Sequence, residues 1–400
     1  MKQLRERFDA FMFKEIKIGK ITMQIVQLFF IFCIFALGLF IRFSLRRFVS
    51  GDMDGSLTEW MTIISENGGF QALALNFGNY NCPYLYILCL ISYLDTNFSF
   101  MYYIKLVSVL FDYLASIVVF LIVYEITEDV RKSTFGLAAV LLAPTVFLNS
   151  AAWGQCDIIY VTFLLLSFYY LLKDKSTASL AFMGLAFSFK LQAVFFLPFL
   201  IIMWLKKKVR LLDFLMVPAM FVITAIPAML FGKKFSDIVA IYVGQTSFYS
   251  KLTMSYPNIY SFVDNNEFTA YLGKAGTFLT IALLGCLAYY LYSQTCRITS
   301  EFMLTLILFC VSIVVYTLPY MHERYGFILD LFAILYGFTA AHPKKIGIAI
   351  AYQMISLLAY TPYLFRSEIF SLIPVAVFYF LLICYVGKDL YLQIKTEKAS

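Results

Sequence analysis

The sequence has little charge. Only 14% of its 400 residues are Asp, Glu, Lys or Arg, whereas 62% are hydrophobic and 19% are aromatic. A single soluble globule of this size could not cover its surface with so few charged side chains. Long apolar stretches alternate with short charged ones from residue 21 to residue 387. They have the length of membrane-spanning helices and lack the alternation of barrel strands, so the sequence predicts an all-α polytopic membrane protein.

The sequence also lacks the residues of several common catalytic sites. It has only two histidines, His322 and His342, which excludes a histidine-rich metal site. There is no Walker loop, dinucleotide fingerprint or nucleophile elbow, so we expect no nucleotide-sugar or ATP site on the cytoplasmic face. We predict no cofactor, although a divalent cation held by Asp52 and Asp54 is left open.

The net charge of +7 does not indicate nucleic-acid binding, and we predict no nucleic-acid partner. The basic residues gather at the ends of apolar stretches, as the positive-inside rule expects. The basic segment 1–20 precedes an apolar stretch that we interpret as an uncleaved first span. With the N-terminus in the cytoplasm, the later basic clusters fall on the same side, and we predict that both termini are cytoplasmic.

We predict one integral membrane domain over residues 1–400, a bundle of about 10–12 spans. The clearest spans are residues 21–42, 101–124, 133–149, 157–172, 211–231, 271–293, 302–319, 326–341, 345–364 and 369–386. The segment 177–204 is interrupted by Lys190 and Gln192 and has basic residues at both ends. A single crossing would violate the charge rule, so we predict two short half-helices that turn back inside the protein.

Two long segments fall on the outer side, residues 43–100 and 232–270, and we expect them to carry short helices. One such helix is predicted at residues 83–94, which are apolar but too few to cross a membrane. The chain ends in a predicted cytoplasmic tail, residues 387–400. Long loops over a helical scaffold are where binding sites tend to lie.

The first outer segment opens with an acidic and aromatic cluster, SGDMDGSLTEW, at residues 50–60. Asp52 and Asp54 lie just beyond the first span, and Glu59 and Trp60 follow. A carboxylate at the membrane surface can act as a general base toward a substrate hydroxyl. The alternative is an ordinary solvated loop carboxylate.

Basic residues at the outer end of the first span run against the positive-inside bias. These residues, Arg42, Arg46 and Arg47, need a compensating charge. Lipid headgroups reached by snorkelling side chains are one explanation. A bound phosphate, which suits the planar guanidinium fork, is the other.

Charged and amide side chains also interrupt later spans. WGQCD brings Trp153, Gln155 and Asp157 close to the outer face. FKLQ places Lys190 at membrane depth, where an unpaired charge is costly. Lys190 therefore either pairs with an acid such as Asp157 or contacts an anionic substrate.

A second dense cluster, LPYMHERYGF, occupies residues 318–327. His322, Glu323 and Arg324 mark a reversal between two spans on the outer side. The loop is short and aromatic, which favours a functional site over a freely solvated turn.

Together these motifs resemble a known family. SGDMDGSLTEW, NGGF, NYNCPYLY, AAWGQCDIIY, FKLQAVFFLP, YPNIY and LPYMHERY are similar to motifs of bacterial integral membrane proteins related to GPI-anchor mannosyltransferases. Those proteins belong to a superfamily of polytopic glycosyltransferases with the GT-C fold. The resemblance implies a bacterial plasma-membrane enzyme with an extracytoplasmic active site. Its partners would be a polyprenyl-phosphate sugar, a glycan or lipid acceptor, and membrane lipids.

The resemblance further implies an inverting transfer of a hexose, mannose by family default, to a hydroxyl of a cell-envelope glycan or lipid. Its catalytic acid maps onto Asp52, eight residues before Trp60. The family pattern often has an aromatic residue after this acid, whereas here Met53 and then Asp54 follow. This departure leaves open which carboxylate is the base.

The remaining candidate residues are assigned to two binding sites around Asp52. We predict a donor-phosphate site formed by Lys190, His322, Arg324, Arg46 and Arg47, and a sugar or acceptor site formed by Trp60, Trp153, Gln155, Asp157, Gln192 and Glu323. The rival function is a transporter or flippase of a lipid-linked or anionic substrate, because membrane-depth charges and broken helices also mark transport pathways. An enzyme would gather these residues at the outer face, whereas a transporter would hold them near the midplane.

Overall fold

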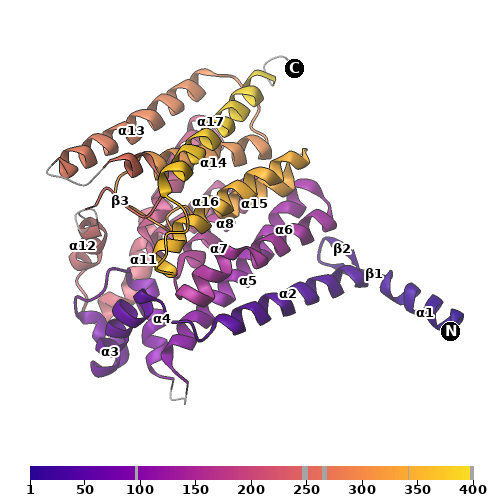
Figure 1. Ribbon diagram of the computed structural model, residues 1–400, viewed down its shortest axis with the longest axis horizontal. Coiled ribbons are helices and arrows are strands. Elements are labelled where there is room, and N and C mark those ends of the chain that lie inside the picture. Colours follow the sequence, from indigo (N-terminus) through magenta and orange to yellow (C-terminus); the bar gives the residue numbers. More distant parts are fainter. Residues whose placement is uncertain (95–97, 246–250, 264–267, 341, 397–400) are drawn as a thin grey trace.

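The computed structural model describes residues 1–94, 98–245, 251–263, 268–340 and 342–396 (Figure 1). Short pieces of both predicted outer loops and the last four residues of the predicted tail lie outside these ranges. Over the described residues the protein is a bundle of helices with two small two-stranded pairings, so the predicted all-α polytopic fold is confirmed. α2 and α13 lie at opposite edges of the bundle in Figure 1, and few of their side chains are buried, as expected of helices that face lipid.

Seven helical segments of the described chain are long and apolar enough to span a membrane. They are α2 (Ile25–Leu45), η5 with α11 (Leu211–Leu215 and Met216–Leu230), α13 (Thr269–Ser293), α14 (Ser300–Thr317), α16 (Ile346–Leu364), α17 (Leu372–Thr396) and α5 (Phe100–Thr127). An eighth is formed if α6 (Val130–Leu142) is counted with α7 (Pro144–Phe147) and η3 (Leu148–Trp153), which are bent by 43°. Pro144 follows the break, where its ring excludes continuation of the i to i−4 hydrogen bonds.

Fewer helices reach spanning length than the 10–12 that we predicted. α8 (Asp157–Leu172) and α15 (Phe327–Thr339) coincide with predicted spans but have only 16 and 13 residues. Both are almost entirely buried by other helices. The apolar side chains of these two helices therefore mainly contact other helices of the bundle.

The helices of the α5–α6 hairpin have recognisable ends. α5 ends at Glu128, whose φ of 53° turns the chain into the left-handed conformation that closes helices. Asp129 then caps α6, because its carboxylate accepts hydrogen bonds from the backbone amides of Arg131 and Lys132. This tight reversal places the end of α5 and the start of α6 at the same end of the bundle.

The predicted re-entrant segment is confirmed. α9 (Ser176–Phe189) runs into the protein, and the chain turns at Lys190. η4 (Leu191–Phe196) and α10 (Leu197–Leu205) then run back toward the start of α9. Both ends lie together, because Lys208 pairs with Asp174 at 3.0 Å. The turn at Lys190 is buried, so this segment delivers a charged side chain to the interior.

The outer loops carry short helices, as predicted. The first contains η1 (Met53–Leu57), α3 (Thr58–Glu66), η2 (Gly69–Ala74) and the largely buried α4 (Cys82–Ser92), which matches the helix predicted at residues 83–94. The second contains α12 (Phe235–Gln245), β3 (Thr253–Met254) and η6 (Ile259–Phe262). β3 pairs in parallel with β4 (Met321–His322), so the second loop is joined to the LPYMHERYGF segment.

Both chain ends differ from the prediction. The N-terminal segment forms α1 (Lys2–Met12) and β1 (Glu15–Ile18), and β2 (Ile21–Gln24) pairs with β1, so the first span begins at Ile25 instead of residue 21. At the other end, α17 continues through most of the predicted tail to Thr396. The short η7 (Pro343–Lys345) precedes α16.

Candidate active site

Asp52 lies between the end of α2 and the start of η1, and three uncharged groups donate hydrogen bonds to its carboxylate. The indole Nε1 of Trp153 and the amide Nε2 of Gln155 donate to Oδ2 at 2.9 and 2.5 Å. The hydroxyl of Tyr363 donates to Oδ1 at 2.5 Å. These donors fix the carboxylate while its side chain stays 26% exposed. Asp52 is thus oriented and still accessible to a substrate.

The loop that carries Asp52 is fastened to the 153–155 segment. The hydroxyl of Ser50 donates to the carbonyl of Trp153 at 2.7 Å and accepts from the backbone amide of Met53 at 3.2 Å. Gly154 has a φ of +77°, and a Cβ there would lie 2.4 Å from the Met53 side chain. Glycine therefore allows both the left-handed backbone and the close approach.

Gln155 is held in turn by Tyr80. The hydroxyl of Tyr80 donates to Oε1 of Gln155 at 2.7 Å, which leaves the amide nitrogen to face Asp52. Burial raises the pKa of Tyr80 well above its usual range, so the hydroxyl stays protonated. Trp60 packs edge-on against the Tyr80 ring at 5.4 Å. Trp60 therefore supports this chain of hydrogen bonds.

Arg324 joins the three acids of the site. Its Nη1 lies 2.7 Å from Oε1 of Glu323 and 3.8 Å from Oδ2 of Asp52, and its Nε lies 3.5 Å from Oδ2 of Asp157. The guanidinium also sits over the ring of Trp153, 5.4 Å from its centroid. Arg324 is the cation nearest to Asp52 among the described residues.

Lys190 pairs with Asp157, the acid that the sequence suggested as its partner. Lys190 Nζ donates to Oδ1 of Asp157, and the side chains are only 5% and 1% exposed. Asn149 donates to the other oxygen of Asp157 at 3.0 Å. A buried pair of this kind resists the removal of either partner. The structure therefore favours the structural interpretation of Lys190 over direct contact with a substrate.

Several predicted site residues lie elsewhere. Asp54 is exposed, and its carboxylate has no hydrogen bond or ion pair within the described ranges. Arg42 is buried and bonded to Asp112 at 2.7 Å, so this arginine is not available to a headgroup or a phosphate. The compensating charge is an acid of α5.

Arg46 and Arg47 line a separate groove between α2 and α5. This groove has a volume of about 530 Å³ and includes Arg42, Phe43 and Tyr102. The guanidinium of Arg46 sits over the Phe43 ring, 3.7 Å from its centroid. Asp52 is not among the lining residues. The structure therefore does not bring these arginines together with Lys190 and Arg324.

Both predicted sugar-stacking tryptophans are buried. Trp153 stacks on Tyr363 with ring centroids 5.1 Å apart and meets Tyr360 edge-on at 5.2 Å. Trp60 is only 6% exposed. In this structure the two indoles position other side chains and offer no open face to a sugar.

A second groove of about 380 Å³ lies beside the charged cluster. Its lining includes Leu191 and Gln192, which follow Lys190, and Tyr325, which follows Arg324. Gln192 is thus placed at the groove and not at Asp52. His322 belongs to the same LPYMHERYGF segment as Tyr325, and its Nδ1 lies 3.5 Å from Oε2 of Glu323. Most of the residues that line the groove are apolar or aromatic.

Three residues that shape the site were not predicted from the sequence. Nothing in the sequence around Tyr363 indicates a functional role, because this residue lies in an apolar stretch typical of an ordinary span. Tyr80 stood in the NYNCPYLY motif, but its bond to Gln155 depends on tertiary contact. Lys105, a buried cation of α5, donates to the carbonyls of Phe48 at 2.5 Å and Arg46 at 3.3 Å and so secures the turn that leads to Asp52.

The sequence also matches a known protein family. The model of glycosyltransferase family 87 matches residues 77–319, which is more than half of the chain. The chain belongs to glycosyltransferase family 87. It is a multi-pass membrane enzyme that transfers sugar, and the resemblance to polytopic membrane glycosyltransferases is confirmed. No curated protein matches the sequence.

The match to family 87 covers only part of the site. It includes the segments that carry Trp153, Gln155, Asp157 and Lys190, and it ends before Arg324. Asp52 lies before its first residue. Within the described ranges, the structure of this family 87 enzyme contains no group of three His, Cys, Asp or Glu side chains placed to hold a metal ion.

Proposed function

We propose that the enzyme transfers a hexose, mannose by family default, from a polyprenyl-phosphate donor to a hydroxyl of a cell-envelope glycan or lipid. The observation that carries this proposal is the carboxylate of Asp52, oriented by Trp153, Gln155 and Tyr363 and still partly exposed. The donors come from two segments far from Asp52 in the sequence, residues 153–155 and the end of α16. A freely solvated loop carboxylate would not be held by side-chain donors from remote segments.

Asp52 acts as the general base in this proposal. The acceptor oxygen attacks the anomeric carbon, the bond from that carbon to the phosphate oxygen breaks, and the acceptor proton passes to Asp52. The polyprenyl phosphate leaves with the bonding electrons, so the anomeric configuration inverts. General-base catalysis of this type typically contributes a factor of about 10² to 10⁴. Asp54 is exposed and lacks the fixed orientation, which supports Asp52 as the base.

The departing phosphate gains negative charge, and Arg324 is the group best placed to offset it. Arg324 is near Asp52 and keeps its charge at any ordinary pH. His322 lies on the same loop and adds a second donor. Lys190 supports Arg324 indirectly, because it neutralises Asp157, which would otherwise bind the guanidinium more strongly.

The groove beside Leu191 and Tyr325 is the place that we propose for the first prenyl units of the donor. It is mainly apolar, and two of its lining residues, Leu191 and Tyr325, adjoin Lys190 and Arg324 in sequence. A lipid tail there leaves the phosphate beside the charged cluster. A membrane-embedded scaffold is needed because this tail stays in the bilayer while the sugar reaches the surface.

We place this chemistry on the extracytoplasmic face of a bacterial plasma membrane, with both termini in the cytoplasm. Basic residues concentrate at the opposite end of the bundle, as the positive-inside rule requires. The site residues also lie at helix ends: Asp52 follows α2, Asp157 begins α8, and Arg324 precedes α15. A transporter would hold its charged residues near the midplane of the membrane, whereas Asp52 lies beyond the end of α2, a helix long enough to span the membrane. This arrangement therefore supports transfer over transport.

The test uses the full-length enzyme in proteoliposomes with a polyprenyl-phosphate hexose that carries an isotopic label. Mass spectrometry of the acceptor, supplied as a cell-envelope extract, should show the labelled sugar. The same hexose supplied as a nucleotide sugar should give no product. Product from the nucleotide sugar alone would overturn the proposed donor class.

A further inference from the structure

The side chains of the N-terminal helix α1 are not covered by other parts of the described chain. None of its residues is buried, and Leu4, Phe8 and Phe11 are 74, 60 and 58% exposed. α1 lies at the edge of the molecule, beyond the β1–β2 hairpin (Figure 1). Large apolar side chains with this exposure mark a contact surface.

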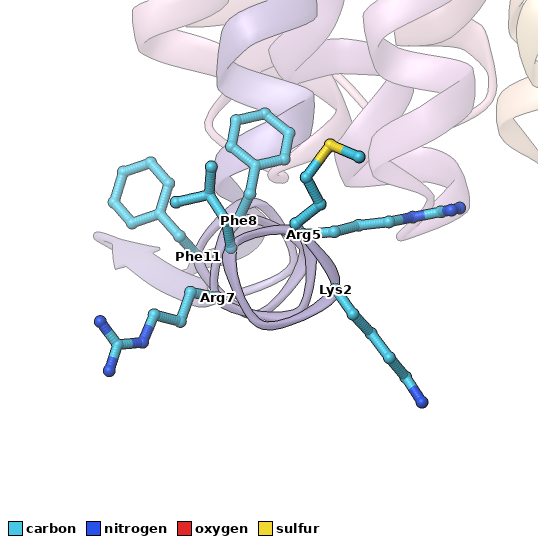
Figure 2. Close-up of a pocket in the computed structure, with 7 residues that line it drawn as sticks. Lys2, Arg5, Arg7, Phe8 and Phe11 are labelled. Atoms are coloured by element: carbon cyan, nitrogen blue, oxygen red, sulfur yellow. The ribbon is translucent and has the colours of Figure 1, made fainter.

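The apolar residues of α1 form one stripe with basic residues on both sides. At about 100° of rotation per residue, Met1, Leu4, Phe8 and Phe11 fall within roughly 80° of the helix circumference. Arg5 and Arg7 flank this stripe, and Figure 2 shows them extending to opposite sides of Phe8 and Phe11. The acids Glu6 and Asp9 lie further around the helix.

The attachment of α1 to α2 fixes where this stripe lies. The carbonyl of Lys14 accepts a hydrogen bond of 3.1 Å from the backbone amide of Ile25, the first residue of the first span. β1 and β2 close the intervening chain into a hairpin. The C-terminal end of α1 is therefore held at the level where α2 enters the bilayer.

The same end of the bundle is rich in basic residues. Met23 packs in one cluster with Phe120 and Leu137, which places the start of α2 beside the end of α5 and the start of α6. Lys173 bonds to Glu125 of α5 at 3.0 Å. A pocket next to this region is lined by Lys175, Lys206, Lys207, Lys208 and Arg210. This face complements an anionic membrane surface.

We propose that α1 lies in the interface of the adjoining leaflet and binds anionic phospholipid. Leu4, Phe8 and Phe11 insert among the acyl chains, while Arg5 and Arg7 reach phosphate groups on either side of the stripe. An 11-residue helix is too short to be stable in water by itself, so the lipid surface supplies its packing partner. The proposal does not depend on the donor or acceptor of the sugar transfer.

Hydrogen–deuterium exchange of the full-length protein tests this proposal. The protein is placed, one copy per disc, in lipid nanodiscs of phosphatidylcholine alone or of phosphatidylcholine mixed with phosphatidylglycerol. Amides of residues 2–12 should exchange slowly in the mixed discs and faster in phosphatidylcholine. Single-copy discs exclude a second copy of the chain as the cover.

Two variants with the same change in net charge separate lipid binding from a general charge effect. R5Q/R7Q should raise the exchange rate of α1 in mixed discs by about 25-fold, since each basic residue at an anionic surface contributes about fivefold to binding. Q3E/A10E adds its charges on the opposite face and should change the rate by less than about fivefold.

Three outcomes would overturn the proposal. They are rapid exchange of α1 in both lipids, equal effects of the two double variants, and slow exchange seen only when several copies share a disc. The last result would instead identify α1 as a contact between copies.

Discussion

Tyr363 donates a hydrogen bond of 2.5 Å to Asp52, although 311 residues separate them in the chain. The bond joins the first outer loop to the end of α16, and Tyr363 also stacks on Trp153, a second donor to the same carboxylate. The proposed base is therefore held by two segments far from it in the sequence, residues 153–155 and the end of α16. Its orientation is a property of the assembled bundle.

Asp52→Asn should lower sugar transfer at least 100-fold, because the amide cannot accept the acceptor proton. The fold should persist, since the new oxygen can accept from Trp153 and Gln155 while the new NH₂ donates to the Tyr363 hydroxyl. Asp54→Asn is the matched control and should retain activity within about threefold. Initial rates in proteoliposomes measure both. A larger loss in Asp54→Asn would assign the base to Asp54, and equal losses would contradict the assignment to Asp52 alone.

Tyr363→Phe should lower the transfer rate about tenfold with little change in the affinity for donor. The variant keeps the ring that stacks on Trp153 and removes only a hydrogen bond to a carboxylate, an interaction of about 1.5–3 kcal/mol. Tyr360→Phe is the matched control, because Tyr360 also packs on Trp153 but makes no hydrogen bond to Asp52. Similar losses in both variants would show that packing around the indole, and not the bond, matters.

Lys190→Met should destabilise the protein by about 3–5 kcal/mol, because it leaves Asp157 buried with less compensating charge. Lys190→Met combined with Asp157→Asn removes both charges and should recover much of this stability. Thermal unfolding in detergent measures the three variants and the parent protein. If Lys190→Met unfolds like the parent protein but binds the lipid-phosphate sugar poorly, Lys190 contacts the donor directly.

Arg324→Gln should raise the KM for the lipid-phosphate donor and lower kcat, because it removes the cation nearest to Asp52. The double variant R46Q/R47Q removes two charges from the groove between α2 and α5 and should leave both parameters within about threefold of the parent. Kinetics at varied donor concentration distinguish the two candidate phosphate sites. A raised KM confined to R46Q/R47Q would move the donor phosphate to that groove.

Topology can be tested with one added cysteine at a time. Ser56→Cys, on the exposed part of η1, should react with a membrane-impermeant maleimide in intact cells. Lys175→Cys, at the basic end of the bundle, should react only after the cells are permeabilised, and the parent protein supplies the background from the native cysteines. Labelling of Lys175→Cys alone in intact cells would place the active site in the cytoplasm.

Much of the architecture follows from the sequence because membrane insertion depends on local composition. Apolar runs of helical length predicted the bundle, and basic residues on both sides of segment 177–204 predicted that it turns back inside the protein. The structure placed this turn at Lys190. The same reasoning predicted about 10–12 spans, whereas seven helical segments of the described chain, or eight if the bent pair is one span, are long and apolar enough to cross a membrane. An apolar run such as Phe327–Thr339 has one composition whether it faces lipid or the protein interior, so hydropathy cannot separate the two environments.

The predicted start of the first span was four residues too early for a related reason. Ile21–Gln24 is apolar enough to extend the first span, but it pairs with Glu15–Ile18 as a hairpin. Backbone hydrogen bonding between two short segments is not visible in hydropathy. The structure alone therefore decided where α2 begins.

The sequence by itself determined the chemical inventory of the candidate site. Asp52, Asp157, Lys190 and Arg324 stand out because charged side chains are rare in so apolar a chain and are costly within a membrane. Their pairing was decided only by tertiary structure. Lys190 meets Asp157, Arg42 meets Asp112, and Tyr363 reaches Asp52 because helix packing sets distances between residues far apart in the chain, and no local pattern encodes those distances.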